Sequence, residues 1–293
     1  MRPWQRITLA LAFLLASCPL QAGGMEETAP VLKGKLLCSR LTDDTWQIWQ
    51  IQLETGKRLQ LTNSPGDKRY PAWGPNRRVI YHATQHACYL VEDNTPGKPV
   101  LEELWPVGDV AYSPDGSRMA FSKYETGLVD SANLWVSGVL EGEPKILTHD
   151  AGLEYNAAWS PDSKWIAYVG SNGYATAEIY LLDPEGNGRL QLTHNRSRDL
   201  LPAWSPDGSE IAYVSDATGD YEIWVMRADG SEPKQLTHSP GLDTRPAWAP
   251  DGKQIAFTSN RSGVLEIWVM NADGTDQRLV EHADGGVCDP AWS

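Results

Sequence analysis

Six carboxylates recur along this chain at intervals of about 45 residues, each shortly before a segment that ends on Trp or Tyr. They are Asp67, Asp109, Glu154, Asp199, Asp243 and Asp289. Such a set of oxygen ligands would suit Ca²⁺, which prefers several of them, or a Lys or Arg of a partner protein. An Asp in a loop also caps its own turn by accepting hydrogen bonds from nearby backbone N–H groups. Because the offset from the following aromatic residue varies, both interpretations stay open.

A sequence repeat positions these carboxylates. Its clearest copies are residues 158–163, 203–208 and 247–252, which share the order Ala-Trp, then Ser or Ala, then Pro-Asp. Weaker copies start at Ala72 and Ala111, and a truncated copy ends the chain. The aromatic positions 73, 112, 159, 204, 248 and 292 are separated by 39, 47, 45, 44 and 44 residues. A period of this length is typical of a propeller blade or a helical repeat.

Each copy has the pattern of strands. Residues 211–214 and 222–226 are short runs containing Ile, Val, Trp and Tyr, and a third short run follows at 234–238. Gly, Pro and Asp separate these runs. No helical period of 3.6 residues persists across a repeat. Each copy therefore predicts four antiparallel strands, and apolar residues on both faces predict that each sheet lies between two neighbours.

We predict an all-β fold, a six-bladed β-propeller, because residues 33–293 accommodate about six periods of 44 residues. The chain ends on an innermost strand, residues 290–293, and starts with outer strands at residues 36–39. We expect the two ends to complete one blade, which removes an exposed sheet edge.

The first 22 residues have the pattern of an export signal, because Arg2 and Arg6 precede the apolar run Ile7–Ala16. Two processing routes are open. Residues 15–18 match a bacterial lipobox, which would leave Cys18 lipid-modified, whereas cleavage after Ala22 would release an unmodified protein. Residues 23–32 form a short linker, and residues 33–293 form the propeller domain. Both routes predict a periplasmic protein whose membrane association, if any, is through the N-terminal lipid.

The formal charge of −13 argues against nucleic acid as a partner and favours cations or basic protein surfaces. It also keeps the protein soluble, and we expect a monomer. Cys38, Cys88 and Cys288 remain in the mature domain, so one disulfide is possible in an oxidising compartment. Cys38 and Cys288 fall in the same predicted blade, but hairpin spacing places Asp289 opposite Cys38, which disfavours a bond between these two cysteines.

Most of the other His and Trp residues stand at repeated positions, which indicates a structural role. His149, His194 and His238 follow Leu-Thr in successive repeats, so symmetry spreads them apart rather than gathering a metal site. Nine of the thirteen tryptophans fall at two repeated strand positions and predict packing between blades. Trp46, Trp105 and Trp165 break this pattern and are candidates for an exposed contact. No Gly-x-Ser-x-Gly elbow is present, which argues against a serine hydrolase.

The repeated segments Pro-Ala-Trp-Ser-Pro-Asp-Gly, Ile-Ala-Tyr/Phe, Ile-Trp-Val-Met and Gln-Leu-Thr resemble the propeller repeat of the TolB family. The resemblance covers about 260 residues and is strongest from Asn156 onward. It implies a periplasmic protein of the Tol–Pal envelope system whose propeller receives a Pal-like lipoprotein at the mouth of its channel. TolB-type proteins carry an α/β domain before the propeller, whereas only the linker precedes it in this sequence.

These observations predict a non-catalytic propeller that docks an envelope protein at the channel mouth, near Asp199 and Asp243. We expect no cofactor, apart from possible Ca²⁺ in the channel. One alternative is a metal-dependent lyase or hydrolase acting on oligosaccharides. Another is a structural or sensing module anchored by a lipid on Cys18.

Overall fold

The structure is a computed structural model that describes residues 32–74, 78–83, 87–91, 98–100, 107–124, 131–139, 143–150, 152–171 and 176–293. The described residues form strands and no helix, and all of the strands belong to one compact unit, Leu32–Ser293. The predicted export signal, Cys18 and most of the linker lie outside the described residues.

The strands fall into six groups of four. The first strands are β24 (Val287–Trp292), β4 (Lys68–Trp73), β8 (Val107–Tyr112), β12 (Leu153–Trp159), β16 (Asp199–Trp204) and β20 (Asp243–Trp248). The second strands are β1 (Lys35–Thr42), β5 (Val79–Ala83), β9 (Arg118–Tyr124), β13 (Ile166–Ser171), β17 (Glu210–Ser215) and β21 (Gln254–Ser259). The third strands are β2 (Thr45–Gln52), β6 (Ala87–Val91), β10 (Ala132–Gly138), β14 (Glu178–Leu182), β18 (Glu222–Arg227) and β22 (Glu266–Asn271). The fourth strands are β3 (Lys57–Gln60), β7 (Lys98–Val100), β11 (Lys145–Ile146), β15 (Leu190–Gln191), β19 (Lys234–Gln235) and β23 (Arg278–Glu281).

Within each group, successive strands pair antiparallel. Four groups are separate four-stranded sheets. The groups β8–β11 and β12–β15 are counted as one eight-stranded sheet because a single parallel pair, Ala132 with Leu153, joins them. No sheet closes on itself among the described strands.

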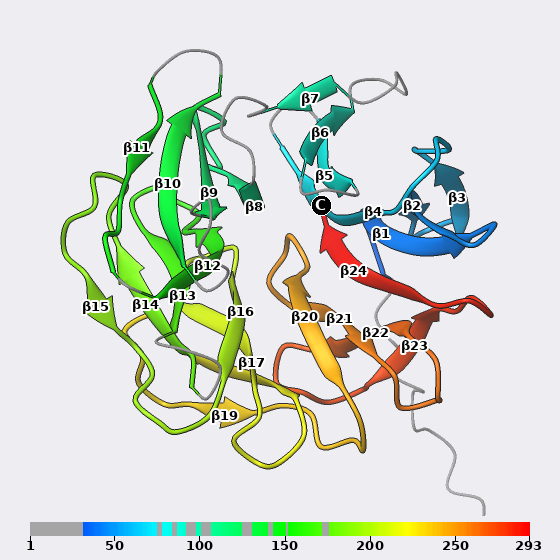
Figure 1. The fold of residues 1–293 in the computed structure, drawn as a ribbon. Coiled ribbons are helices and arrows are strands. Elements are labelled where there is room, and N and C mark those ends of the chain that lie inside the picture. The colour runs from blue at the N-terminus through cyan, green and yellow to red at the C-terminus, as the bar shows by residue number, and fades with distance from the viewer. Residues whose placement is uncertain are drawn as a thin grey trace, which may run out of the picture. The chain divides into compact units, whose positions relative to one another are not determined.

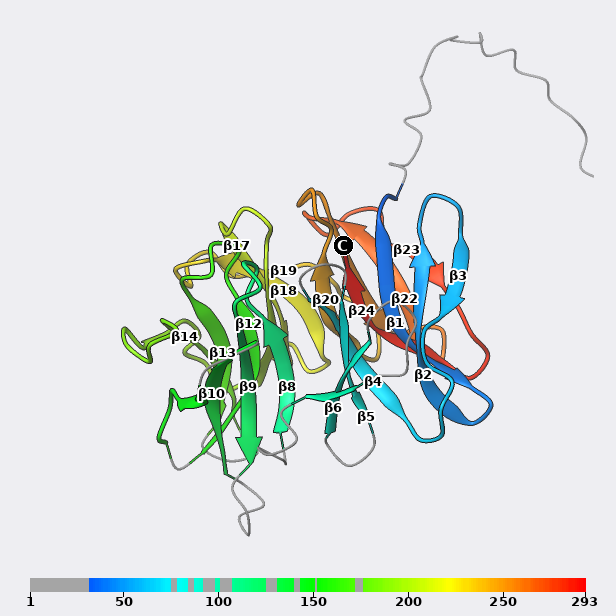
Figure 2. The same cartoon turned by 90° about the horizontal axis from the view of Figure 1, so that it is seen from above.

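The first strands of the groups lie toward a common centre (Figure 1). Each of these strands contacts the first strand of the next group, and β24 contacts both β20 and β4. Figure 2 shows the strands along their length, with hairpin turns at both ends of the sheets. The first strand of each group therefore faces the centre.

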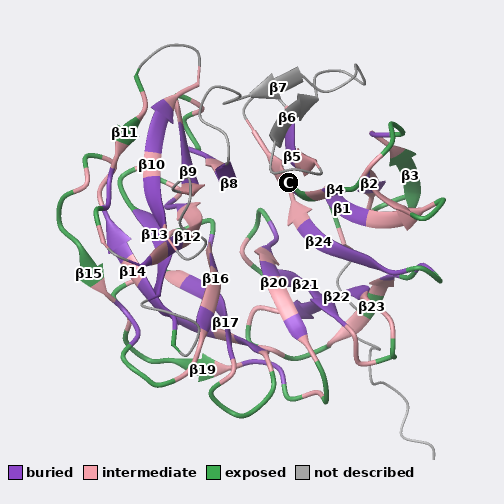
Figure 3. Cartoon of the chain, in the orientation of Figure 1, coloured by how far each residue is buried: buried purple, intermediate pink, exposed green. Residues whose placement is uncertain are grey.

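The hydrophobic core is divided among the spaces between neighbouring groups. One cluster, for example, joins Ile179 of β14 to Ile211 and Met226 of the next group, and a second joins Ile223 to Phe257 of the group after that. Six such clusters occur, one for each neighbouring pair, including one between β1–β2 and β5. Burial therefore concentrates on the middle strands, and exposure on turns and on outer strands such as β3 and β15 (Figure 3). This is why both faces of the middle strands carry apolar residues.

A Ser-Pro-Asp-Gly segment forms the turn after β8 and β16, and the variants Ser-Pro-Asp-Ser and Ala-Pro-Asp-Gly form it after β12 and β20. In the clearest copy, the Gly208 N–H donates to the Ser205 carbonyl at 2.9 Å, and Asp207 accepts from the Ser205 hydroxyl and the Ser209 N–H. Gly208 has a φ of 73°, a conformation that glycine adopts without strain. The motif thus satisfies its own polar groups within the turn.

Four of the repeated Trp side chains form a hydrogen bond to the preceding group. The Nε1–H groups of Trp159, Trp204 and Trp248 donate to the carbonyls of Ala111, Ala158 and Ala203 at 3.1, 3.2 and 3.1 Å. Trp73 donates in the same way to Ala291 at 3.0 Å. The predicted packing role of these residues is therefore confirmed, and it includes a specific hydrogen bond.

The C-terminal strand β24 pairs with β1 in the sheet β24-β1-β2-β3. Lys35 and Ser293 exchange backbone hydrogen bonds of 2.8 and 2.9 Å. Cys288 is opposite Ser39, and a register shift lies between Leu37 and Ser39, next to Cys38. Cys38 and Cys288 are buried and free in this structure. The side chain of Cys88, in β6, lies outside the described residues.

Candidate functional site

The six predicted carboxylates occupy three different positions relative to the aromatic residue that ends each first strand. Glu154, Asp199 and Asp243 lie at the strand starts or next to them, Asp109 and Asp289 lie in mid-strand, and Asp67 precedes β4. The structure therefore does not place the six carboxylates at the same position along the first strands.

The three carboxylates at the strand starts are buried and bonded within the protein. Asn195 Nδ2 donates to Asp199 Oδ2 at 2.6 Å, and the Thr148 hydroxyl donates to Glu154 Oε2 at 3.0 Å. Asp243 Oδ2 accepts from Arg261 Nη2 at 2.7 Å. In this structure these side chains offer little surface to a partner.

A second set of buried polar groups lies beside them. The Thr237 hydroxyl accepts from the Ile223 N–H at 2.9 Å and donates to Glu222 Oε2 at 2.5 Å. Thr193 and Glu178 repeat this arrangement one group earlier. Burial, together with the nearby Asp243 carboxylate, raises the pKa of Glu222 to about 7. Burial likewise raises the pKa of Glu154 to about 7, and that of Asp199 above its ordinary value. The Thr of the Gln-Leu-Thr segment thus has a structural role.

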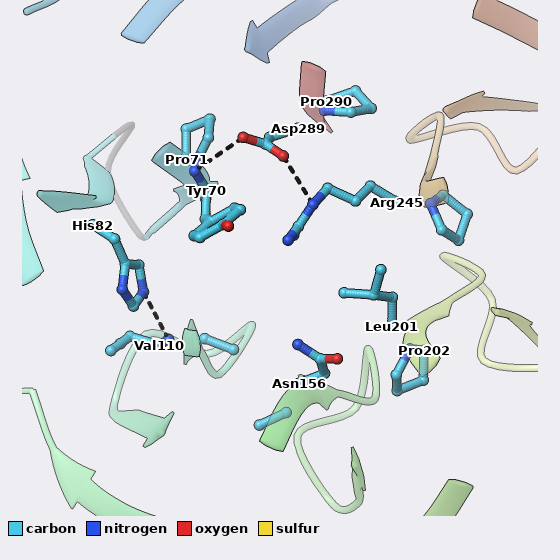
Figure 4. A pocket seen from close by; sticks show the side chains of 14 residues that line it. Tyr70, Pro71, His82, Val110, Asn156, Leu201, Pro202, Arg245, Asp289 and Pro290 are labelled. Carbon is cyan, nitrogen blue, oxygen red and sulfur yellow. Dashed lines mark hydrogen bonds and ion pairs between the residues drawn. The ribbon is translucent and has the colours of Figure 1, made fainter. Parts of the chain in front are cut away.

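Asp289 is buried between two arginines. Arg69 Nε lies 2.8 Å from Asp289 Oδ2. Arg245 Nε lies 2.8 Å from Asp289 Oδ1 (Figure 4). Burial acts to raise the pKa of Asp289, but the guanidinium groups of Arg245 and Arg69 hold it below its ordinary value. The Arg245 guanidinium also lies over the Tyr70 ring, 4.1 Å from its centroid. The charge of Asp289 is therefore neutralised within the protein.

One cavity of about 200 Å³ is lined by residues from all six first strands. Its wall includes Tyr70, Val110, Asn156, Leu201, Arg245 and Asp289, whose side chains Figure 4 shows around the opening. We call this the central cavity. Arg245 gives it a positive group, and Asn156 and Tyr70 give it further polar groups.

The backbone is irregular where it lines the central cavity. Tyr70, Asn156, Leu201, Arg245 and Asp289 all have φ between 53° and 56°, which is strained for residues other than glycine. The pairing of β16 with β17 shifts register between Leu200 and Ala203, and the other first strands have the same irregularity. Such bulges re-aim side chains. In four strands a Pro follows the strained residue, which suits a sheet edge because Pro has no N–H to leave unpaired.

His82 of β5 also lines the central cavity. Its ring packs edge-on against Tyr70 at a centroid distance of 5.8 Å, and its Nε2 accepts from the Val110 N–H at 3.5 Å. Sequence reasoning missed Tyr70, His82 and Arg245. The signal for Tyr70 and Arg245 was variation: the position three residues before the aromatic holds a different residue in almost every repeat, whereas Pro-Ala follows it in four of the six.

The remaining predicted residues are dispersed. Asp67 is exposed and accepts from the Trp46 N–H of β2 at 2.9 Å, a backbone group outside its own turn. Asp109 lies in β8, but its side chain is outside the described residues, as are Trp105 and Cys18. Trp46 is partly buried beneath Arg69. His149, His194 and His238 are exposed on three different groups.

The described residues contain no group of three or more His, Cys, Asp or Glu side chains placed to hold a metal ion. Arginines already neutralise Asp243 and Asp289, and positive charge next to a carboxylate opposes a cation. The described carboxylates therefore do not form the oxygen cage that Ca²⁺ requires, and the ion stays a prediction. Within the described residues, no helix has the length and hydropathy needed to cross a membrane.

Residues 173–293 match the family model described as the TolB beta propeller domain. A Tol-Pal system protein TolB of Anaeromyxobacter dehalogenans is 30% identical over 131 residues, which are 39% of this chain and 27% of that protein. The solved TolB of Acinetobacter baumannii superposes with a TM-score of 0.75 at 20% identity, over 88% of this chain and 66% of that one. The chain contains a TolB-like β-propeller. This confirms the predicted resemblance.

Proteins other than TolB also resemble this chain. An uncharacterized peptidase of Bacillus subtilis, YuxL, is 35% identical over 83 residues, which are 27% of this chain and 13% of that protein. An oligogalacturonate lyase solved in complex with manganese shares the fold with a TM-score of 0.61 at 18% identity, over 86% of this chain and 74% of that one. The chain spans about a quarter or less of the length of these two sequence relatives.

Proposed function

We propose that this protein is a non-catalytic, periplasmic, six-bladed propeller that docks an envelope protein at the central cavity. The observation that supports this most is that six first strands contribute to one cavity, five of them through residues on strained backbone. Strained residues that point into a shared opening are typical of binding sites, and most of these side chains differ from one strand to the next. The likeness to TolB makes a lipoprotein such as Pal the first candidate partner.

We expect the partner to contact Tyr70, Asn156 and Leu201. Asp199 and Asp243 are too deeply buried for such a contact. Tyr70 is 37% exposed at the cavity, whereas Asp199 and Asp243 are fully buried. An aromatic side chain at the centre of an opening is a frequent anchor of protein interfaces. The mouth therefore presents mixed polar and aromatic groups rather than a ring of negative charge.

A photo-cross-linking phenylalanine at position 70 tests this proposal. The substitution is nearly isosteric with Tyr70, and the same group at position 279, an exposed leucine in β23, is the matched control. In intact envelopes we expect position 70 to capture one envelope protein that position 279 does not capture. A second substitution, Asn156→Arg, should abolish that capture because it fills the cavity. The same proteins captured from both positions would contradict the proposal.

We further propose export by residues 1–22, with the mature chain starting either at a lipidated Cys18 or after Ala22. Mass spectrometry of the mature N-terminus distinguishes these outcomes. An unprocessed Met1 would contradict both.

The alternative is a metal-dependent lyase or hydrolase acting on oligosaccharides. The observation that favours it is the convergence of His82, Arg245 and Tyr70 on one cavity of a fold shared with an oligogalacturonate lyase. Cleavage of an anionic oligosaccharide that a chelator abolishes would establish it. Cleavage that survives in the variant Arg245→Gln would locate any activity elsewhere.

A further inference from the structure

A second cavity of about 660 Å³ lies between the groups β12–β15 and β16–β19. It is lined by residues of the Ser-Pro-Asp turns that follow β12 and β16, and it shares no lining residue with the central cavity. Its apolar wall consists of Trp165, Leu181, Leu190 and Trp204. We call it the Trp165 groove. Its volume falls in the range of about 300–1,000 Å³ that is usual for ligand-binding clefts.

The Trp165 groove depends on two apolar residues, of which Trp165 is particular to this repeat. Trp165 occupies the position after the turn where other repeats have Arg118, Glu210 or Gln254. Leu190 occupies the position of Lys145, Lys234 and Arg278, and Leu59 of β3 also stands there. Fold stability does not need an apolar residue at either position, since three other repeats carry a polar one at each.

Both replacements are exposed. Trp165 is 39% and Leu190 is 50% exposed, and each belongs to the small set of large apolar residues on the described surface. Two exposed apolar side chains beside one concave surface indicate an interaction site more strongly than scattered ones do.

The groove is preformed. The backbone N–H of Trp165 donates to Ser160 Oγ at 2.9 Å. The Trp165 ring lies against Gly188, and a Cβ added at Gly188 would be 3.6 Å from this ring. The Trp204 Nε1–H is fixed on the Ala158 carbonyl at 3.2 Å. A rigid wall reduces the entropy cost of binding.

Carboxylates border the apolar wall. Asp207 and Asp229 are exposed lining residues, and neither makes an ion pair within the described part of the chain. Hydrogen bonds from Ser205 and Ser209 hold the pKa of Asp207 below its ordinary value, and Ser231 does the same for Asp229. Both are therefore negative at neutral pH. Asp162, a third lining carboxylate, lies 3.3 Å from Lys164.

We propose that the Trp165 groove binds an extended segment of a partner protein in which an apolar side chain is flanked by Lys or Arg. The apolar side chain would pack on Trp165 and Leu190, and the cations would pair with Asp207 and Asp229. An anionic lipid surface or a nucleic acid would be repelled by these carboxylates and by the net charge of −13. A second copy of this chain has the same net charge and is disfavoured for the same reason.

A phage library of random dodecapeptides tests the proposal. It is selected on the wild-type protein and counter-selected on the double variant Trp165→Gln with Leu190→Lys, whose side chains already occur at the equivalent positions of other repeats. This variant should therefore fold, and its thermal midpoint checks that it does. We expect enriched peptides that combine an aromatic or aliphatic residue with neighbouring Lys or Arg.

The enriched peptide is then measured by fluorescence anisotropy. We expect at least tenfold weaker binding to the counter-selection variant, and severalfold weaker binding to Asp207→Asn with Asp229→Asn. The control Leu279→Lys, which removes a leucine that is 46% exposed outside the groove, should leave affinity unchanged. The absence of enriched peptides, enriched peptides without cationic residues, or equal affinity for wild type and the counter-selection variant would overturn the proposal.

Discussion

The strained residues around the central cavity set a limit on which side chains the cavity can carry. Leu201 has a φ of 53°, a region that Asn tolerates and β-branched residues avoid. We expect Leu201→Val to be less stable than Leu201→Asn by about 1 kcal/mol or more, although Val is the more apolar residue. Chemical unfolding of both variants measures the difference.

The neighbouring leucine provides the control. Leu200 is paired with Val214 in β17 and is not among the residues with positive φ, so Val should be tolerated there better than Asn. The same order at both positions would mean that backbone strain does not govern position 201.

The buried carboxyl groups predict how stability depends on pH. The pKa of Glu222 is raised from 4.5 to about 7. Between these values the folded state keeps a proton that the unfolded state has lost, so the free energy of unfolding falls as pH rises through this window. A Gln at position 222 has no titratable proton, so it removes this pH dependence. Gln47 stands at the equivalent position of the first group, where its Oε1 accepts a hydrogen bond of 2.8 Å from the Thr62 hydroxyl. We expect Glu222→Gln to gain about 1–3 kcal/mol relative to wild type between pH 4.5 and pH 8.

The reciprocal change is a matched test. Gln47→Glu introduces a buried carboxyl at the equivalent position, so this variant should lose stability relative to wild type over the same pH range. The free energy of unfolding of wild type and both variants is measured by urea unfolding at each pH. Parallel pH dependences for the three proteins would contradict the raised pKa of Glu222.

At the scale of the strand, the indole hydrogen bonds between groups should be measurable. Trp204→Phe keeps the aromatic packing but removes the bond to the Ala158 carbonyl, so we expect a loss of about 1 kcal/mol. Trp224→Phe is the control, because the Nε1 of Trp224 is buried without a hydrogen-bond partner among the described residues. That substitution should be neutral or stabilising. Equal losses at both positions would show that ring packing alone is responsible.

The sequence pattern predicted the strands well because their cause is local. Runs such as Glu222–Met226, separated by turns with Pro, Asp and Gly, specify strands without knowledge of their neighbours. It did not predict which carboxylates face water. The sequence places Asp199 and Asp243 in loops, yet both are buried in the structure. Asp243, for example, is paired with Arg261 of the next hairpin. The bulge at Leu201 was also missed, because a shift of register leaves no mark in the hydrophobic pattern.

At the scale of the whole molecule, the pairing of β24 with β1 makes the two ends of the described chain interdependent. Lys35 and Ser293 are hydrogen-bonded neighbours, so a short linker between the ends should permit new termini at the exposed turn after Asp229. We expect this circular permutant to unfold in one cooperative transition. Deletion of residues 287–293 should instead expose the edge of β1 and cause aggregation, which size-exclusion chromatography detects. A monomeric, cooperative deletion variant would contradict the proposed six-bladed ring.

The central claim is that the six first strands together form one docking site. Hydrogen–deuterium exchange of the protein, alone and with the partner captured through position 70, tests it most directly. The account predicts slower exchange in peptides that cover β4, β8, β12, β16, β20 and β24, with little change in β3, β15 and β19. Protection confined to the outer strands, or to a single group, would contradict it.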